Sequence, residues 1–363
     1  MSSFFPSRTV AIYMARLFFV RTFGILAVLV LVLQALDLLS NSAKILGVPG
    51  NTDAQVWTYV SLRAPQIVST FLPFSVLLGT ILTLIQMNQN SEVVALKAAG
   101  MSAHQVLAPL VFASFGVALL SFAFNDRIVS RATATLNAWQ KVEYRALPAD
   151  RGDRSNVWVR EGDTLVQVAQ VRGRGAGVRL GGITAYERDG GSLVSILTAA
   201  RGSYTGNGWQ LEETRRFIVA TGTTERPGTL RFGSSIRPDQ LTLAAVDAEG
   251  LPFGALRTAI ADLEGAGRPT KALEGALWHK LSGPLSSVLM PLLGAVAAFG
   301  IARSGKLFVR AVIGMGLGFA YFVADNFALA MGNLGAYPPF LAAWAPFLLF
   351  ALIGEAVLIR TEE

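Results

Sequence analysis

The sequence of 363 residues contains no cysteine, and charged residues make up only 15% of it. The absence of cysteine excludes a disulfide framework, a thiolate metal site and a cysteine nucleophile. Hydrophobic residues make up 52% of the chain, and they gather in long runs instead of being spread evenly. A chain with few charges and with apolar runs long enough to cross a bilayer is predicted to be an integral membrane protein.

Sites for nucleic acid, metals and catalysis are also poorly represented. The net charge of +7 comes from residues at the ends of apolar runs and in one polar segment, not from a basic stripe interleaved with aromatics. The two histidines, His104 and His279, are far apart, and neither has a carboxylate pair or metal-ligand spacing beside it in the sequence. We therefore expect no nucleic-acid partner, no metal and no catalytic residues.

Six apolar runs are candidates for membrane spans. The first follows a basic, partly apolar segment at residues 4–21, which we expect to be retained because no small-residue cleavage site follows it. The second carries no charge from Ala64 onward and holds Pro65 and Pro73, which membrane helices tolerate. The predicted spans cover residues 23–39, 64–90, 106–124, 281–302, 311–331 and 339–359.

A polar, glycine-rich segment separates the third and fourth runs, and its short apolar stretches predict a β-sandwich or open jelly roll. The pair Asn207-Gly208 favours a hairpin, because both residues accept the positive φ of a two-residue turn. The strand that holds Val166 and Val168 is apolar on both faces, which fits either a covered core or a slot for an acyl chain. The predicted domains are residues 1–125, with a short helix at about 89–104, then 126–252 as the β domain, and 253–363.

The short helix between the second and third spans is predicted from its ends. Ser91 is an N-cap type of residue, Glu92 falls in the first turn, and Gly100 is a typical helix stop. Val93 and Leu96 give the helix an apolar side, so it is expected to lie along a membrane face. Such a helix is either a docking element for a soluble partner or a polar connector with ordinary caps.

The distribution of Lys and Arg in the short loops predicts the orientation. Basic residues flank the first span, the short helix, the loop between spans four and five, and the end of span six, whereas residues 332–338 carry no charge. Both termini and the short helix are therefore expected to be cytoplasmic, with the β domain on the opposite side.

One motif, in the loop between the fourth and fifth predicted spans, resembles a nucleotide-binding site. Residues 300–306 have the spacing of a Walker A loop. However, Leu307 stands where the Mg²⁺-binding Ser or Thr is required, and an apolar segment precedes the motif in place of a strand. We interpret it as a basic cytoplasmic turn.

Ionisable residues inside the spans are costly unless they face protein or water. Asp37 stands at the far end of span one, and Asp325, followed by Asn326, stands in span five. Glu355 is near enough to the end of span six to reach the interface. Asp325 is either a buried hydrogen-bonding residue between helices or part of a pathway.

The residues from Asn90 to Ser102 resemble the cytoplasmic coupling helix of the LptF/LptG family of lipopolysaccharide-export permeases. Residues 316–326 and 334–346 resemble the fifth and sixth helices of the LptG branch. The similarity extends over essentially the whole chain. It implies a bacterial inner-membrane protein with six transmembrane helices, arranged three and three around a periplasmic jelly roll.

The resemblance also implies the function and the partners. The chain would be a transport permease, not an enzyme, in an ABC exporter that extracts lipopolysaccharide from the inner membrane. Its partners would be a homologous LptF-like permease, a cytoplasmic LptB-like ATPase dimer that holds ATP and Mg²⁺, and periplasmic LptC/LptA-like jelly-roll proteins. No cofactor would reside in this chain.

The resemblance assigns roles to particular residues. Glu92 matches the coupling-helix acid, supported by Ser91, Val93, Leu96 and Gly100, and Asp37 matches an acidic position near the lipid headgroup. Gln34, Leu136 and Trp139 stand where basic residues are common, so other cations would have to substitute. The implied lipid-contacting residues are Leu36, Asp37, Lys44, Arg127, Arg131, Phe319, Phe322, Val166 and Val168.

Two other classes of protein fit parts of this sequence pattern. A permease of another ABC exporter, for a lipoprotein or a peptide, also has coupling helices but usually a different number of spans around its extracytoplasmic domain. A membrane-anchored sensor or assembly factor would need neither a twin permease nor an ATPase.

Overall fold

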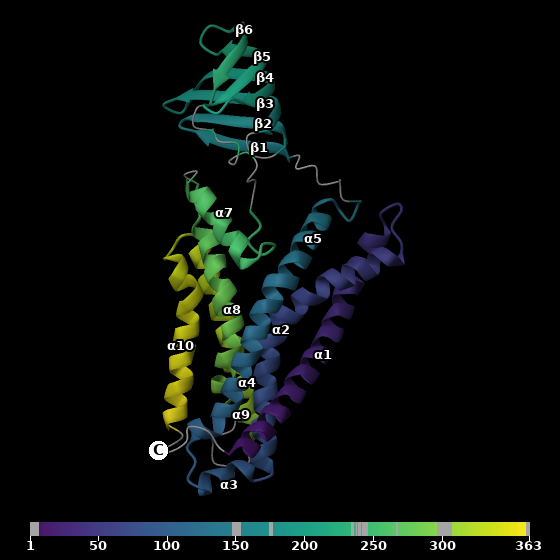
Figure 1. The fold of residues 1–363 in the computed structure, drawn as a ribbon, viewed down its shortest axis with the longest axis vertical. Coiled ribbons are helices and arrows are strands. Elements are labelled where there is room, and N and C mark those ends of the chain that lie inside the picture. The colour runs from purple at the N-terminus through teal and green to yellow at the C-terminus, as the bar shows by residue number, and fades with distance from the viewer. Residues whose placement is uncertain are drawn as a thin grey trace. The chain divides into compact units, whose positions relative to one another are not determined.

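The computed structural model describes residues 7–146, 154–173, 177–233, 236, 238, 241, 246–265, 268–295 and 307–360 (Figure 1). The chain forms two compact units. The helical unit comprises residues 1–146, 247–257 and 270–363, and the β unit comprises residues 147–246 and 258–269.

The first half of the helical unit is built on an antiparallel helix pair. Helix α1 (Arg8–Leu46) packs along α2 (Asp53–Gln89), and the short α3 (Glu92–Ala98) leads into α4 (Ala103–Phe124). These helices confirm the first three predicted apolar segments, although α1 joins the predicted interfacial segment and the first span into one helix. Pro65 and Pro73 lie inside α2 without ending it.

The predicted boundary at Asp126 falls inside a helix. After α4, the chain continues through a π-helical segment (Asn125–Val129) into α5 (Ser130–Lys141). Ala132, Leu136 and Trp139 are buried at helical spacing, so this polar-looking stretch has an apolar face that packs inward. The carboxylate of Asp126 accepts a hydrogen bond from the backbone N–H of Phe253 (2.6 Å), at the start of a later helix.

The second half of the helical unit returns through α8 (Lys271–Ala295), α9 (Leu307–Asn333) and α10 (Pro339–Arg360), after α7 (Phe253–Gly265). Helix α8 packs against α2, α4, α9 and α10. Within the described residues, five helical segments are long and apolar enough to cross a membrane. The fourth predicted span lies in α8 up to residue 295, and its remainder, together with the Walker-like turn at 300–306, lies outside the described residues.

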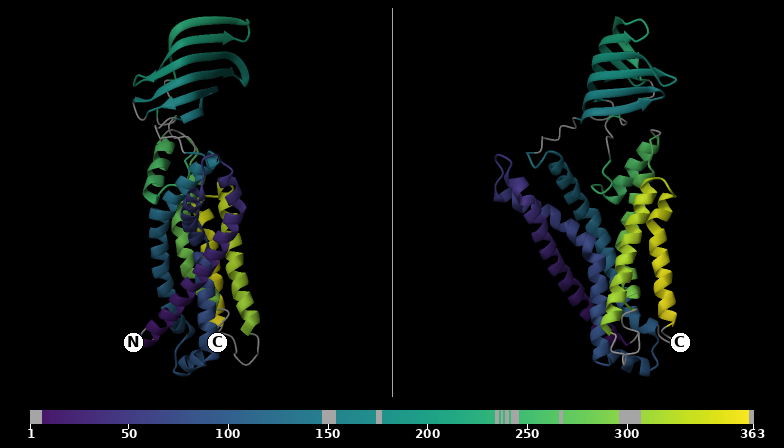
Figure 2. Two further views of the ribbon diagram at one scale, coloured as in Figure 1. Left: turned by 90° about the vertical axis from the view of Figure 1, so that its right-hand side faces the viewer. Right: turned by 180° about the vertical axis from the view of Figure 1, so that it is seen from behind.

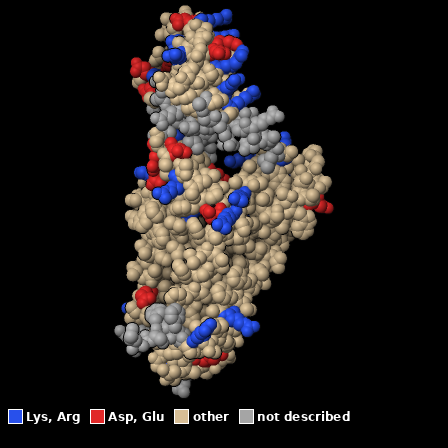
Figure 3. Space-filling model, in the orientation of Figure 1, with Lys and Arg blue, Asp and Glu red and all other residues tan. Residues whose placement is uncertain are grey.

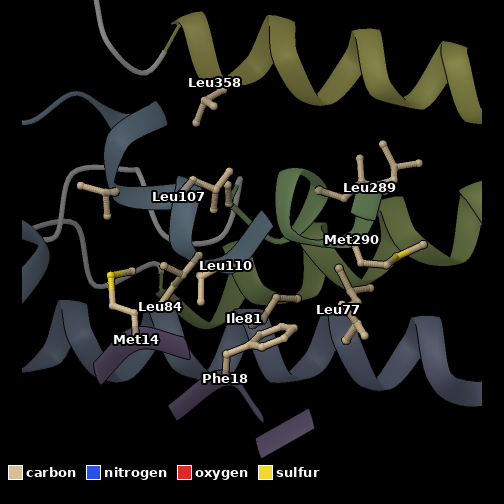
Figure 4. Packing of buried hydrophobic residues seen from close by; sticks show 14 of the residues in the cluster. Met14, Phe18, Leu77, Ile81, Leu84, Leu107, Leu110, Leu289, Met290 and Leu358 are labelled. Atoms are coloured by element: carbon tan, nitrogen blue, oxygen red, sulfur yellow. The ribbon is translucent and has the colours of Figure 1, made fainter. Parts of the chain in front are cut away.

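The core of the helical unit is a continuous apolar cluster. The cluster includes Met14 and Phe18 of α1, Leu77 and Ile81 of α2, and Leu107 of α4 (Figure 4). Further members come from α8, α9 and α10. This packing fixes the α1–α2 pair against the other helices at the end of the unit that carries α3.

The start of α1 and the end of α10 lie at the same end of the helical unit as α3 (Figure 2). On the face shown in Figure 3, charged side chains gather toward the two ends of the helical unit, and a broad uncharged band lies between them. This distribution is typical of a unit whose middle contacts lipid.

The β unit is an antiparallel sheet of six strands in sequential order. The all-β domain is therefore confirmed, and its described strands form an up-and-down meander without a crossover connection. Its core includes Val168, Ile183, Leu197 and Trp209. The strands are β1 (Arg154–Glu161), β2 (Thr164–Arg172), β3 (Arg179–Asp189), β4 (Ser192–Tyr204), β5 (Trp209–Ile218) and β6 (Thr223–Phe232).

The predicted hairpin at Asn207-Gly208 joins β4 to β5, but its turn differs from the expected one. The positive φ angles fall on Gly206 (88°) and Gly208 (130°) and not on Asn207. The backbone N–H of Thr205 donates to the carbonyl of Gly208 (3.0 Å) and closes a four-residue loop. The two glycines supply the conformations that a side chain disfavours.

Candidate functional site

Helix α3 has one anchored side and one open side. Val93 is buried in the core of the helical unit, and Leu96 is half-buried against the same core. Val94, Ala95 and Ala98 are exposed. Val93 and Leu96, which the resemblance groups with the coupling acid, therefore hold the helix to its own chain, and the exposed residues form its open face.

The two ends of α3 are fixed by backbone geometry. At the C-terminus, the N–H of Met101 donates to the carbonyl of Leu96 (3.2 Å) and the N–H of Gly100 donates to Lys97 (2.9 Å), with Gly100 at φ 85°. This is a Schellman motif, in which glycine takes the left-handed position. At the N-terminus, Ser91 occupies the cap position at φ 60°, but its side chain makes no capping hydrogen bond. Ser91 is therefore at the predicted cap position, without the side-chain hydrogen bond that an N-cap serine usually makes.

The carboxylate of Glu92 is held by one of its two oxygens. Oε1 accepts hydrogen bonds from the hydroxyl of Tyr13 on α1 (3.2 Å) and from the side-chain amide of Asn90 (3.0 Å). Nearby, Arg21 of α1 donates to the carbonyl of Leu82 (3.0 Å) and contacts Gln86 at the end of α2. The acid is thus positioned at the junction of α1, α2 and α3.

A second polar network lies toward the opposite end of the α1–α2 pair. Asp37 accepts a hydrogen bond from the hydroxyl of Tyr59 (2.6 Å) and is ion-paired with Arg63 (3.3 Å). Arg63 also donates to Gln66 (2.6 Å), and Gln66 donates to the hydroxyl of Thr133 on α5 (3.0 Å). The structure therefore places Asp37 in an internal network linking α1, α2 and α5. Arg63 was not predicted as a site residue, because it directly precedes the charge-free run from Ala64 and looks like the charged end of a span.

A satellite apolar cluster supports this end of the helical unit. Ile45, Tyr59, Leu136, Trp139 and Tyr144 pack together, at the end of α1, the start of α2 and the end of α5. Leu136 and Trp139 are core residues of this cluster. Their burial explains why they are apolar here.

A cavity of about 1400 Å³ lies beside the satellite cluster. Lys44, Asn51, Gln55 and Arg145 are among its lining residues. Lys44 is exposed, and Arg145 is ion-paired with Glu143 (3.5 Å) at the surface. Glu143 also lines the cavity, so Lys44 supplies its unbalanced positive charge, next to an apolar cluster. An amphipathic anion suits such a surface.

The remaining lipid-contact predictions fall in different places. Leu36, Phe319 and Phe322 are exposed, at 56%, 61% and 36%, and Arg127 and Arg131 are also exposed. Gln34 has buried amide atoms that accept or donate no hydrogen bond within the described part of the chain. In the β unit, Val166 and Val168 are 3% and 0% exposed, so both lie inside the core of this structure.

Both histidines have a carboxylate near them, contrary to what their sequence neighbours indicated. His104 of α4 contacts Glu355 of α10 (Nε2–Oε1 2.7 Å). His279 of α8 lies 3.9 Å from Asp325 of α9, measured from Nδ1 to Oδ2. Asn326, the next residue, is exposed and donates to the carbonyl of Phe322 (2.8 Å). No group of three or more potential metal ligands occurs among the residues that the structure describes.

The fold and these sites define a polytopic helical membrane protein with an inserted β unit and a short helix held between two spans. Comparison with known proteins gives the family. The family model for the lipopolysaccharide export system permease LptF/LptG matches residues 12–360, and the chain belongs to this family.

Named relatives carry the LptG designation. The lipopolysaccharide export system permease protein LptG of Escherichia coli strain K12 is 26% identical over 314 residues, which covers 83% of this chain and 84% of the relative. LptG of Haemophilus influenzae is 23% identical over 322 residues, covering 85% and 87% of the two chains. The chain is thus a multi-pass inner-membrane transport permease.

Proposed function

We propose that this chain is the LptG-type half of an ABC exporter that extracts lipopolysaccharide from the inner membrane and passes it to a periplasmic bridge. The observation that carries the proposal is the positioning of Glu92 on a short, anchored helix between two spans, in a chain of this family. An acid fixed there is suited to receive a soluble partner.

The partner on α3 would be a cytoplasmic ATPase dimer of the LptB type. Its groove would contact the open face of α3 and the second oxygen of Glu92. ATP and Mg²⁺ would be bound and used in that subunit, and no cofactor would reside in this chain. A homologous LptF-like permease would complete the membrane part, and LptC/LptA-like jelly rolls would continue the bridge.

The lipid would contact exposed apolar residues of α1 and α9. Its anionic headgroup would lie near Lys44, in the cavity beside the satellite cluster. A large lipid with several acyl chains needs an apolar wall and cationic groups at headgroup level. Exposed Leu36 and Phe319 supply the wall, and Lys44 supplies a cation. Asp37, because it is paired with Arg63, would hold the helices that shape the cavity.

We expect lipid crosslinking to distinguish this surface from the general lipid-facing surface. Because the chain has no cysteine, single reactive positions can be introduced without background. Photo-crosslinkers at Leu36, Lys44, Phe319 and Phe322 in the active complex should trap lipopolysaccharide. Leu352 of α10, 69% exposed, is the matched control and should give much weaker adducts.

Adducts at Leu352 that equal those at the four test positions would contradict the proposed cavity. Adducts with a lipoprotein instead of lipopolysaccharide would favour the alternative exporter. Crosslinkers at Val166 and Val168 report on the β unit, since adducts there require its core to open.

Membrane topology provides a second test. Arg8 begins α1, Lys97 lies in α3 and Arg360 ends α10, and these three elements meet at one end of the helical unit (Figure 2). Residues 332–338, between α9 and α10, carry no charge. We expect a reporter fused in the α9–α10 loop or in the β unit to be periplasmic, and one fused at 303–306 to be cytoplasmic, because Lys and Arg are retained inside. Cytoplasmic labelling of the β unit would exclude the export role.

A further inference from the structure

Asp325 occupies an unusual position for a carboxylate. It lies eight residues before the end of α9, is 7% exposed, and its Oδ1 is buried and accepts no hydrogen bond from the described residues. An isolated ionised carboxylate in such surroundings is strongly unfavourable. The position therefore calls for a neutralising partner.

The neighbouring helix supplies one candidate. His279 Nδ1 of α8 lies 3.9 Å from Asp325 Oδ2 and 3.4 Å from the hydroxyl of Ser282. The first distance is within ion-pair range but too long for a hydrogen bond. Tyr321, buried one turn before Asp325, lies on the same face of α9. The two helices thus bring a half-buried imidazole and a buried carboxyl close together.

Among the residues that the structure describes, no other ionisable group is placed to neutralise Asp325. Helix α2 has no charged residue after Arg63, and α4 has none at all. In α10, Glu355 is engaged with His104, and Arg360 is in its last turn. Within α9, the other charged residue is Arg310, near its opposite end.

Lys280 is the nearest further charge on α8. Its electrostatic partners are Asp126, Asp247 and Glu249, and its charge opposes a second positive charge on His279. Lys271 and Glu274 lie in the first turn of α8. Among the described residues, His279 is therefore the group that can neutralise the carboxylate of Asp325.

We propose that His279 and Asp325 form a proton-binding site between α8 and α9. With neutral imidazole and ionised carboxylate, the pair carries one negative charge. Binding one proton from water makes the pair neutral, either as imidazolium with carboxylate or as imidazole with carboxylic acid. The neutral pair favours close packing of α8 on α9, and loss of the proton leaves a buried charge that favours their separation.

This site is independent of the ATPase contact at α3. Movement of α9 relative to α8 would expose or enclose the pair and so change its proton affinity. Proton binding and helix movement are then linked, because whatever favours one packing favours the matching protonation state.

The two histidines of the chain allow a direct test. The full chain, labelled with ¹⁵N-histidine in detergent micelles, should give two imidazole signals, assigned by His104→Gln and His279→Gln. Asp325→Asn should move the titration midpoint of His279 to lower pH by about one unit or more, because the carboxylate no longer favours imidazolium. The His104 signal should not move.

Glu355→Gln is the matched control and should move His104 but not His279. An unchanged His279 titration in Asp325→Asn, or equal movement of both histidines in either variant, would overturn the proposal. Should Asp325→Asn fail to fold, His279→Gln provides the same test from the other side. In that variant the infrared band of a protonated carboxyl should persist to higher pH than in the parent, and identical pH dependence would overturn the site.

Discussion

Glu92→Lys is expected to abolish stable capture of the ATPase while leaving the chain folded and inserted. The Glu92 carboxylate lies at the surface end of α3, and Val93 and Leu96, not Glu92, anchor that helix in the core. Reversing one charge of a desolvated contact costs on the order of 2–5 kcal/mol, or about 30-fold to several thousand-fold in affinity. Co-purification of the ATPase with tagged permease, followed by titration, measures the loss.

Three variants make this result specific. Glu92→Ala should have a smaller effect, because it removes attraction without adding repulsion. Glu225→Lys applies the same charge reversal to an exposed residue of β6 and should leave capture unchanged. Tyr13→Phe removes a donor to Oε1 and should weaken capture only modestly. Normal capture and normal export in Glu92→Lys would show that α3 is an ordinary connector.

Gly79→Ala is expected to lower stability strongly for a single methyl group. A Cβ at this position would lie 3.0 Å from the backbone N and Cα of Thr22 and closer still to its hydroxyl, so α1 would have to move away from α2. Overpacking of this kind typically costs about 1–3 kcal/mol, and the cost should be at the upper end because the obstacle is backbone. The melting temperature of the purified chain in detergent should fall by several degrees.

The control for this prediction is Gly24→Ala, two residues from Thr22 on α1. A Cβ there meets nothing within 4 Å, so the substitution should be neutral or slightly stabilising. Thr22→Ala should recover part of the loss in Gly79→Ala, because it removes the nearest atom but not the backbone contacts. Equal melting temperatures for Gly79→Ala and Gly24→Ala would show that α1 and α2 are not packed this closely.

Much of the fold could be predicted from local pattern. Long apolar runs, the glycine stop at Gly100 and the short strands each depend on residues close in sequence, and the structure places helices and strands there. The predicted start of the β domain at residue 126 lies inside the helical unit, because the polar residues of α5 alternate with an apolar face formed by Ala132, Leu136 and Trp139. Their helical spacing was a usable signal for the extra turns.

The candidate sites were less predictable because they join distant residues. His104 and Glu355 are separated by 251 positions, and no local pattern indicates their contact. The contact between Asp37 and Arg63 is easier to predict from the sequence. They lie at similar distances on either side of the loop that joins α1 to α2, and an antiparallel helix pair brings such residues together.

The continuous helical segment from α4 to α5 has a mechanical consequence. Its 39 residues, at 1.5 Å per residue, make a rod about 58 Å long that begins beside the Schellman end of α3 and ends at the satellite cluster. A tilt of this rod about its middle moves its two ends in opposite directions by similar distances. A displacement of α3 would then move the α5 end of the rod and change the shape of the cavity beside the satellite cluster. The movement would be that of a rigid body and would not depend on rearrangements of successive side chains.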